Sequence, residues 1–147
     1  MERTTFDLRR FVDAQRSTFD AALAELRAGR KRGHWMWFVF PQLRGLGRSE
    51  TSRHYGLAGL DEARAYAAHP ILGPRLRAAA DALLGLPAEL EAVAVLGPID
   101  AVKLRSSATL FRRAAPDEPR FGALLDRFFD GAADPATEAL LGVGDAD

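Results

Sequence analysis

The sequence predicts an all-α protein, a single compact domain of about seven to nine short helices arranged as an irregular orthogonal bundle. Apolar residues recur along most of the chain at the 3.6-residue spacing of amphipathic helices. Thirteen glycines and eight prolines divide these stretches into short segments joined by tight turns. The 147 residues fit one domain, with an ordered core expected over about 6–141 and frayed residues at 142–147.

Most predicted helices have a recognisable start or stop signal. Gly29 ends the first helix, expected over 7–28, and Ser49 and Asp61 are placed to cap the starts of two others. The apolar run 35–40, halted by Pro41, fits a buried strand as well as a buried helix. The remaining helices are expected from 49 to 55, 61 to 68, 72 to 84, 88 to 96, 99 to 113, 121 to 129 and 135 to 141.

Composition excludes several classes of protein. With 48% apolar and 27% charged residues, the chain is neither disordered nor membrane-spanning. The N-terminus has no stretch of signal-peptide type, so we expect a cytoplasmic protein. The absence of cysteine excludes disulfides and thiolate sites, and the three histidines lack the spacing of a zinc motif. No phosphate-binding or dinucleotide-binding glycine motif occurs, and we predict neither a metal nor a cofactor.

The charges of the chain are balanced but separated. Twenty basic residues cancel twenty acidic ones, yet residues 27–53 hold seven basic residues against Glu50 alone. Residues 117–147 hold eight acidic residues against Arg120 and Arg127. A basic region of this kind attracts anions locally, although a dipolar surface without a partner explains it equally well.

Lysine is scarce in this sequence. Of the twenty basic residues only Lys31 and Lys103 are lysines, and the other eighteen are arginines. A compact ammonium and a planar guanidinium are not equivalent. We therefore interpret the two lysines as residues at positions that arginine does not fill, with chance as the alternative.

Two predicted helices carry polar residues within their apolar faces. Gln15 lies in the middle of the first apolar face, and a buried amide without a partner costs about 1–3 kcal/mol. It therefore either bonds to neighbouring backbone or faces a polar pocket. On the helix 99–113, Asp100, Lys103 and Ser107 follow one another at i, i+3 and i+7. We expect Asp100 to pair with Lys103, either at the margin of the core or lining a cleft.

The segment 31–49 concentrates groups that bind ligands. Trp35 and Trp37 offer planar surfaces with N–H donors, near Lys31 and His34. Gln42 adds an amide at a turn fixed by proline. Backbone N–H groups near Gly45 and Gly47, with Arg48 and Ser49, suit an oxyanion. The alternative is an ordinary aromatic core followed by an ordinary turn.

These residues resemble the domain of unknown function 1810 family over about 6–141. The matching blocks are FVDAQ (11–15), KRGHWMWFVFPQ (31–42), GLGRS (45–49), EARAY (62–66), HPILG (69–73) and DAVKLRSS (100–107). The resemblance implies an all-α fold, with a helix at 35–40, and no established activity. Members are sometimes labelled calpastatin, but calpastatin-type inhibition relies on disordered repeats, which this chain lacks.

The blocks of the family coincide with the polar residues singled out above. We therefore expect one pocket formed by Gln15, His34, Trp35, Gln42, Ser49, Lys103 and Ser107. The leading hypothesis is a pocket for a small anionic, nucleotide-like or ADP-ribose-like ligand, bound by these residues together with Lys31, Trp37 and Arg48. If it hydrolyses a phosphate or glycosidic linkage, His34 is the expected general base, assisted by Asp100 or Lys103.

Two other hypotheses stay open. A non-catalytic protein-interaction module predicts that Trp35 or Trp37 lies on an open apolar patch. Nucleic-acid binding is a third hypothesis, supported by the basic segment 27–53 but opposed by zero net charge and the acidic C-terminal region.

Overall fold

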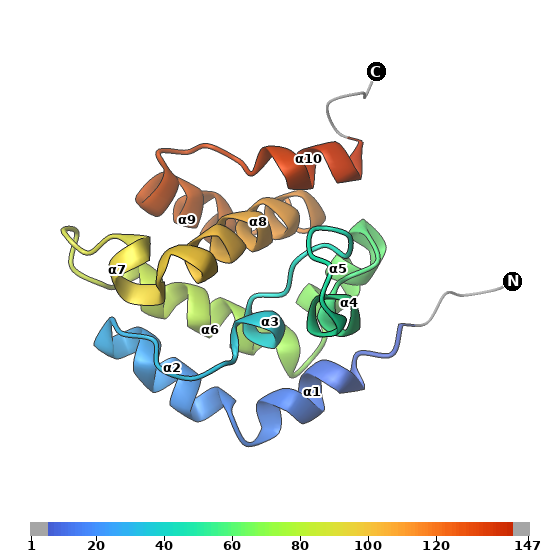
Figure 1. The fold of residues 1–147 in the computed structure, drawn as a ribbon, viewed down its shortest axis with the longest axis horizontal. Coiled ribbons are helices and arrows are strands. Elements are labelled where there is room, and N and C mark those ends of the chain that lie inside the picture. The colour runs from blue at the N-terminus through green and yellow to red at the C-terminus, as the bar shows by residue number, and fades with distance from the viewer. Residues whose placement is uncertain (1–5, 143–147) are drawn as a thin grey trace, which may run out of the picture.

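A computed structural model describes residues 6–142 of the chain and contains ten α-helices in that range (Figure 1). The all-α prediction is confirmed; the only β-type pairing among these residues is one isolated parallel bridge between Leu43 and Leu57. No helix in the described range is long and apolar enough to cross a membrane. The fraying expected at 142–147 concerns residues of which all but Gly142 lie outside the described part. The helices are α1 Arg9–Arg16, α2 Phe19–Ala28, α3 Met36–Val39, α4 Glu50–Tyr55, α5 Leu60–Ala68, α6 Leu72–Leu84, α7 Ala92–Leu96, α8 Pro98–Ala114, α9 Pro119–Phe129 and α10 Pro135–Leu141.

Helix α8 is the central element of the bundle. It packs against α5, α7, α9 and α10, while α6 packs against α2, α5 and α9 (Figure 1). Arg105 of α8 donates hydrogen bonds to the carbonyl oxygens of Ala132 (2.9 Å) and Ala133 (2.8 Å), which attach the α9–α10 connection to α8. The short helix α3 lies in front of this bundle and contacts α1, α4 and α6.

Aromatic side chains fill the core between these helices. Phe11 and Tyr66 meet edge to face with their ring centroids 5.0 Å apart, and Phe111 stacks on Phe121 at 5.4 Å. These four rings are almost completely buried, as is that of Trp35. Burial of such large apolar surfaces is the main source of stability in a bundle of short helices.

The single helix predicted over 7–28 is wrong, because the chain bends at Ser17 and Thr18. Helix α1 ends at Arg16 and α2 begins at Phe19. The two pieces have different partners, since α1 packs against α3 and α2 packs against α6. One straight helix would not reach both, and the apolar periodicity runs through the bend without marking it.

The other helix boundaries follow the sequence signals with three exceptions. One is α9, which was expected from residue 121 but starts at Pro119, because proline fits the first position of a helix. Ser49 caps α4 as predicted, its hydroxyl oxygen accepting the Ser52 N–H at 3.0 Å. Asp61 does not cap α5, which starts one residue earlier, and it pairs with Arg64 at 2.8 Å instead. The helix expected from residue 88 starts only at Ala92, because a turn precedes it.

Candidate functional site

The loop between α2 and α3 is fixed by hydrogen bonds to α2 and to α7. Gly29 ends α2 in the left-handed conformation (φ 77°), which turns the chain toward α7. The backbone N–H of Lys31 then donates to the carbonyl oxygen of Val95 at 2.8 Å. One carboxylate oxygen of Glu25 on α2 accepts hydrogen bonds from the loop, namely from the N–H groups of Arg32 (2.8 Å), Gly33 (3.0 Å) and the Trp35 indole (2.8 Å).

This loop delivers Lys31 to α8, where we define the Asp100 cluster as Lys31, Trp35, Trp37, Asp100 and Lys103. The ammonium of Lys31 lies 2.8 Å from one carboxylate oxygen of Asp100, and that of Lys103 lies 3.2 Å from the other. The same ammonium groups lie over the indole rings, Lys31 at 5.1 Å from the Trp35 centroid and Lys103 at 3.8 Å from that of Trp37. Both lysines of the chain therefore pair with one aspartate, and each lies over one of the two tryptophans.

Charge and burial act against each other in this cluster. Burial by itself raises the pKa of Asp100, but the hydrogen bonds and charges of Lys31 and Lys103 outweigh it and hold the pKa below its ordinary value. For Glu25 the same balance holds: burial raises its pKa, while the bonds from the loop N–H groups and the charge of Lys31 lower it further. Both carboxylates are thus held in their charged form near neutral pH.

An open hollow of about 380 Å³ lies beside the cluster, between the chain after α3 and the first half of α8. Its lining is mainly apolar. Two of the apolar side chains, both on α8, are unusually exposed: Ile99 is 72% exposed and Val102 is 60% exposed. The lining residues of this Trp37 hollow are Trp37, Gln42, Leu46, Gly47, Pro98, Ile99, Val102 and Lys103. The volume lies within the usual range of small-molecule pockets.

The amide of Gln42 is the second polar group of the hollow after Lys103. Its nitrogen donates to the hydroxyl oxygen of Ser106 on α8 at 2.6 Å. Its backbone carbonyl accepts the Leu57 N–H at 2.9 Å, in the isolated bridge that joins the two connections flanking α4. Loop and helix thus hold this residue from two sides.

Comparison with known families gives a match to a model described as "Protein of unknown function (DUF1810)" over residues 5–141. The chain belongs to this family. Among solved structures, it is similar to the conserved hypothetical protein Rv1873 from Mycobacterium tuberculosis, with 49% sequence identity and a TM-score of 0.91. The similarity covers 93% of this chain and 97% of the other. No match was found among curated proteins.

Five of the residues predicted for the site in this DUF1810 chain line the Trp37 hollow or belong to the ion pairs with Asp100. Trp37, Gln42 and Lys103 line the hollow. Asp100 pairs with Lys103 and also with Lys31, and neither Asp100 nor Lys31 lines the hollow. The predicted pairing of Asp100 with Lys103 is confirmed. Arg48 follows the lining residue Gly47 in the chain and is exposed, and no ion pair joins it to any residue between 6 and 142.

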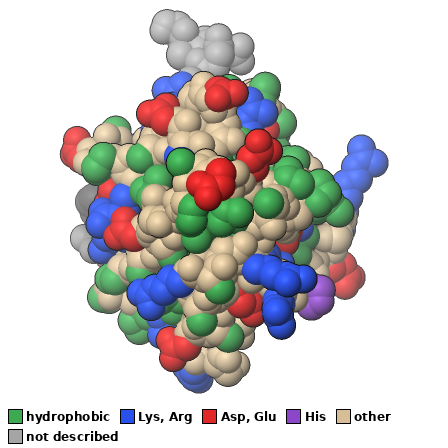
Figure 2. Space-filling model, turned by 90° about the vertical axis from the view of Figure 1, so that its left-hand side faces the viewer, with side chains coloured by type: hydrophobic (Ala, Val, Ile, Leu, Met, Phe, Trp, Pro, Cys, Tyr) green, Lys and Arg blue, Asp and Glu red, His purple; other side chains and the backbone are tan. Residues whose placement is uncertain are grey.

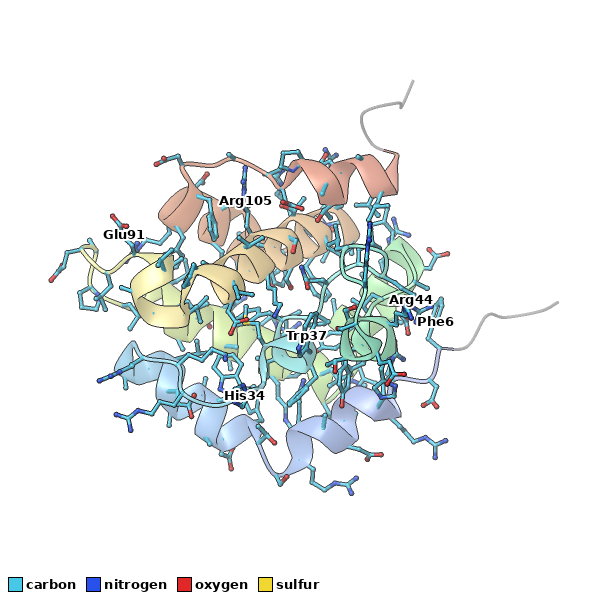
Figure 3. All side chains as sticks on the ribbon, in the orientation of Figure 1. Phe6, His34, Trp37, Arg44, Glu91 and Arg105 are labelled. Carbon is cyan, nitrogen blue, oxygen red and sulfur yellow. The ribbon has the colours of Figure 1, made fainter. Side chains whose placement is uncertain are left out.

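Four other singled-out residues lie outside the hollow's lining. His34 is exposed on the loop before α3, and Figure 3 shows it over α2, away from Trp37. The Trp35 indole is buried and bonded to Glu25. Ser49 caps α4. The hydroxyl of Ser107 is buried on α8 and has no hydrogen-bond partner among the described residues.

Gln15 is a core residue in this family member. It is 1% exposed, and its amide nitrogen donates to the Phe38 carbonyl oxygen at 2.7 Å and to the Tyr66 hydroxyl oxygen at 3.0 Å. Its amide oxygen accepts a weak bond from Arg75 at 3.4 Å. The expectation that this buried amide has partners is confirmed, and they belong to the core.

Sequence reasoning missed several residues of the site. Ser106 could have been found, since it lies three residues after Lys103 and so on the same helix face. The exposure of Ile99 and Val102 could not be predicted, because exposed and buried apolar residues look alike in a sequence. Nothing in the sequence pointed to Glu25, whose role depends on the path of the following loop.

Other surfaces of the molecule offer less chemistry. A hollow of about 440 Å³ lies between α7, α8 and α9, where Arg127 is already bonded to the carbonyl oxygens of Pro87 (2.7 Å) and Leu90 (2.9 Å). Figure 2 shows hydrophobic, acidic and basic side chains interspersed on the face of the molecule at the left of Figure 1. No group of three or more His, Asp or Glu side chains within 6–142 is arranged to hold a metal ion.

Proposed function

We propose that this DUF1810 protein binds a small nucleotide-like anion in the Trp37 hollow. The observation that carries the proposal is the position of the Lys103 ammonium, which lies against the Trp37 ring at the wall of an open, mainly apolar hollow. An apolar pocket with a few convergent polar groups is the usual form of a small-molecule site.

The ammonium of Lys103 keeps capacity for a ligand. An ammonium has three N–H donors, and within the described residues the Lys103 ammonium donates one hydrogen bond, to Asp100. The Trp37 ring covers another side of the ammonium. A donor remains for a carboxylate or phosphate oxygen, and Asp100 fixes the direction in which it points.

The apolar walls suit the uncharged part of such a ligand. Ile99 and Val102 are held on a rigid helix and are largely exposed, so covering them with an aromatic ring removes apolar surface from water. Together with Trp37 they form the apolar side of the hollow. A base or similar flat ring is complementary to this side, and its anionic group is complementary to Lys103.

The surrounding charge favours the approach of an anion. Of the seven basic residues in 27–53, only Lys31 forms an ion pair with another described residue. Of the others, Arg48 is exposed and follows the lining residue Gly47, so its positive charge lies near the hollow. The geometry supports binding rather than hydrolysis, because the lining contains no His, Asp or Glu to act as a general base.

Calorimetric titration with AMP, ADP-ribose and uncharged adenosine tests this proposal. We expect both anions to bind and adenosine to bind at least about tenfold more weakly, because it lacks the group that Lys103 holds. Val102→Asp, which adds a carboxylate to the hollow, should weaken AMP binding at least about tenfold. The matched control is Val93→Asp on α7, where the valine is 53% exposed and outside the Trp37 hollow.

The outcomes separate clearly. Failure of both anions to bind the wild-type protein at millimolar concentration rejects the proposal. Binding that is unchanged in Val102→Asp but weakened in Val93→Asp assigns the ligand to the hollow at α7 and α9 and also rejects it. Lys103→Met should weaken AMP binding while leaving adenosine binding unchanged, since only the anion contacts the ammonium.

A second candidate function is docking of a protein partner, favoured by the exposure of Ile99 and Val102 beside Trp37. An apolar side chain of a partner would enter the hollow, with an acidic residue near Lys103. This function predicts that a purified partner is lost on Val102→Asp and kept on Val93→Asp, and that AMP does not compete with it.

A further inference from the structure

We infer that the amide oxygen of Gln42 determines the selectivity of the Trp37 hollow, accepting a hydrogen bond from an N–H group on the ligand's ring. The inference rests on the proposed function and narrows its ligand class. The ligand is then an aromatic heterocycle with an amino or ring N–H donor and, separately, an anionic group for Lys103.

The backbone of Gln42 is fixed before any ligand arrives. Pro41 restricts the chain just ahead of it. The carbonyl oxygen of Gln42 accepts the Leu57 N–H at 2.9 Å, and the Arg44 N–H donates to the Leu57 carbonyl oxygen at 2.7 Å. These two bonds on either side of Leu43 attach this part of the loop to the chain after α4.

The side chain of Gln42 is fixed by Ser106. The Ser106 hydroxyl has a backbone acceptor on its own helix, the carbonyl oxygen of Lys103 at 3.2 Å, so its hydrogen points along α8. Its lone pairs then face the Gln42 amide nitrogen, which donates to it at 2.6 Å. This bond uses one N–H of the amide and fixes the plane of the group, so the position of the amide oxygen is fixed as well.

That oxygen is unused in the described part of the chain. No hydrogen bond from residues 6–142 reaches it, although Gln42 lines the hollow. The hollow therefore presents one fixed acceptor, Gln42, and one fixed cationic donor, Lys103, with the apolar side chains of Trp37, Ile99 and Val102 as its walls. A ring that turns an acceptor toward this amide oxygen leaves two acceptors facing each other without a proton between them.

The test compares AMP with purine riboside 5′-monophosphate, which differs by the loss of the 6-amino group. We expect the wild-type protein to bind AMP about tenfold more tightly, the value of one net hydrogen bond. Gln42→Met, of similar size but without polar atoms, should abolish this difference by weakening AMP binding alone. Ser106→Ala, which releases the amide, should reduce the difference, and the control Ser107→Ala should preserve it.

Each result decides the inference. Equal affinity of the two nucleotides for the wild-type protein rejects it, and so does a difference that persists in Gln42→Met. In both cases the nucleotides still bind and the proposed function stands. If neither nucleotide binds the wild-type protein, the proposed function fails and this inference fails with it. Thermal melting of each variant shows whether it is folded. If Gln42→Met is unfolded, Ser106→Ala decides the inference, and an undiminished difference between the two nucleotides in that variant rejects it.

Discussion

Lys31 and Lys103, from distant parts of the chain, bond the two oxygens of one carboxylate, that of Asp100, at 2.8 and 3.2 Å. Each ammonium also lies over an indole ring. The arrangement joins the loop before α3 to the first turns of α8, and it sets the position of the one ammonium that reaches the Trp37 hollow. The stability of this junction is therefore linked to the geometry of the proposed site.

Asp100→Asn should destabilise the protein by about 2–3 kcal/mol, because two largely buried ammonium groups lose the charge that compensates them. Urea unfolding at pH 7 measures the loss. The control is Asp81→Asn: Asp81 pairs with Arg120 at 2.8 Å, but its side chain is 56% exposed. Exposed pairs contribute less than about 1 kcal/mol, so equal losses in the two variants would contradict the role given to Asp100.

Lys31→Arg should also destabilise the protein, by about 1–3 kcal/mol, although it keeps the charge. The Lys31 side chain is 9% exposed and bonds both Asp100 and the Gly33 carbonyl oxygen, so a larger planar guanidinium overfills the space. Arg30→Lys, at the exposed neighbouring position, should change the free energy of unfolding by less than about 0.5 kcal/mol. If Lys31→Arg leaves the free energy of unfolding unchanged, chance alone explains the lysine at this position.

Contacts within one helix of this site could be predicted from the sequence, whereas contacts between distant parts of the chain could not. The scarcity of lysine marked Lys31 and Lys103, and helical spacing predicted the pairing of Asp100 with Lys103, because i and i+3 side chains are neighbours on any helix. That Lys31 reaches the same carboxylate depends on how the loop after Gly29 crosses α8. No local pattern encodes that path.

The fold shows the same limit. Helix 72–84 was predicted with its exact bounds, since glycine and proline punctuate it. The bend between α1 and α2 was missed, because periodicity reports which face is apolar and not which neighbour covers it. For the same reason Gln15 and Ser107 were recognised as inward-facing, whereas their distance from the hollow's lining was not predictable.

Ser106 and Ser107 should respond oppositely to alanine. Ser106→Ala removes the acceptor of the Gln42 amide and should cost about 1 kcal/mol. Ser107→Ala should be neutral or stabilising, since it removes a buried hydroxyl that has no partner within the described residues. Urea unfolding of both variants gives the comparison. A loss of more than about 1 kcal/mol in Ser107→Ala would reveal a bond that the hydroxyl makes in solution.

Gln15→Leu should cost about 1–3 kcal/mol of stability while leaving AMP affinity unchanged. It deprives the Phe38 carbonyl and the Tyr66 hydroxyl of a donor within the core. Tyr66→Phe should cost less, because the amide of Gln15 still reaches Phe38. Unfolding and calorimetric titration measure the two effects separately, and weaker AMP binding by a stably folded Gln15→Leu would place Gln15 in the ligand site.

Stability should fall as the solution is acidified below about pH 5, and Glu25 should account for part of the fall. Its ordinary pKa is 4.5, and the loop N–H groups and Lys31 hold the folded pKa lower against the effect of burial. On acidification the unfolded chain therefore takes up a proton first, and the folded state loses relative stability until the folded pKa is passed. Asp100, with an ordinary pKa of 3.8 that is lowered in the fold, acts in the same direction at lower pH.

Urea midpoints of the wild type and Glu25→Gln at pH 7, 5, 4 and 3 measure this dependence. The glutamine keeps an oxygen to accept the loop bonds but does not titrate, so its midpoint should fall less between pH 5 and 3. Glu89→Gln is the control, because Glu89 is exposed and forms no hydrogen bond with the described residues. If the midpoints of Glu25→Gln and the wild type fall in parallel, the Glu25 carboxylate is not what makes the attachment of this loop sensitive to acid.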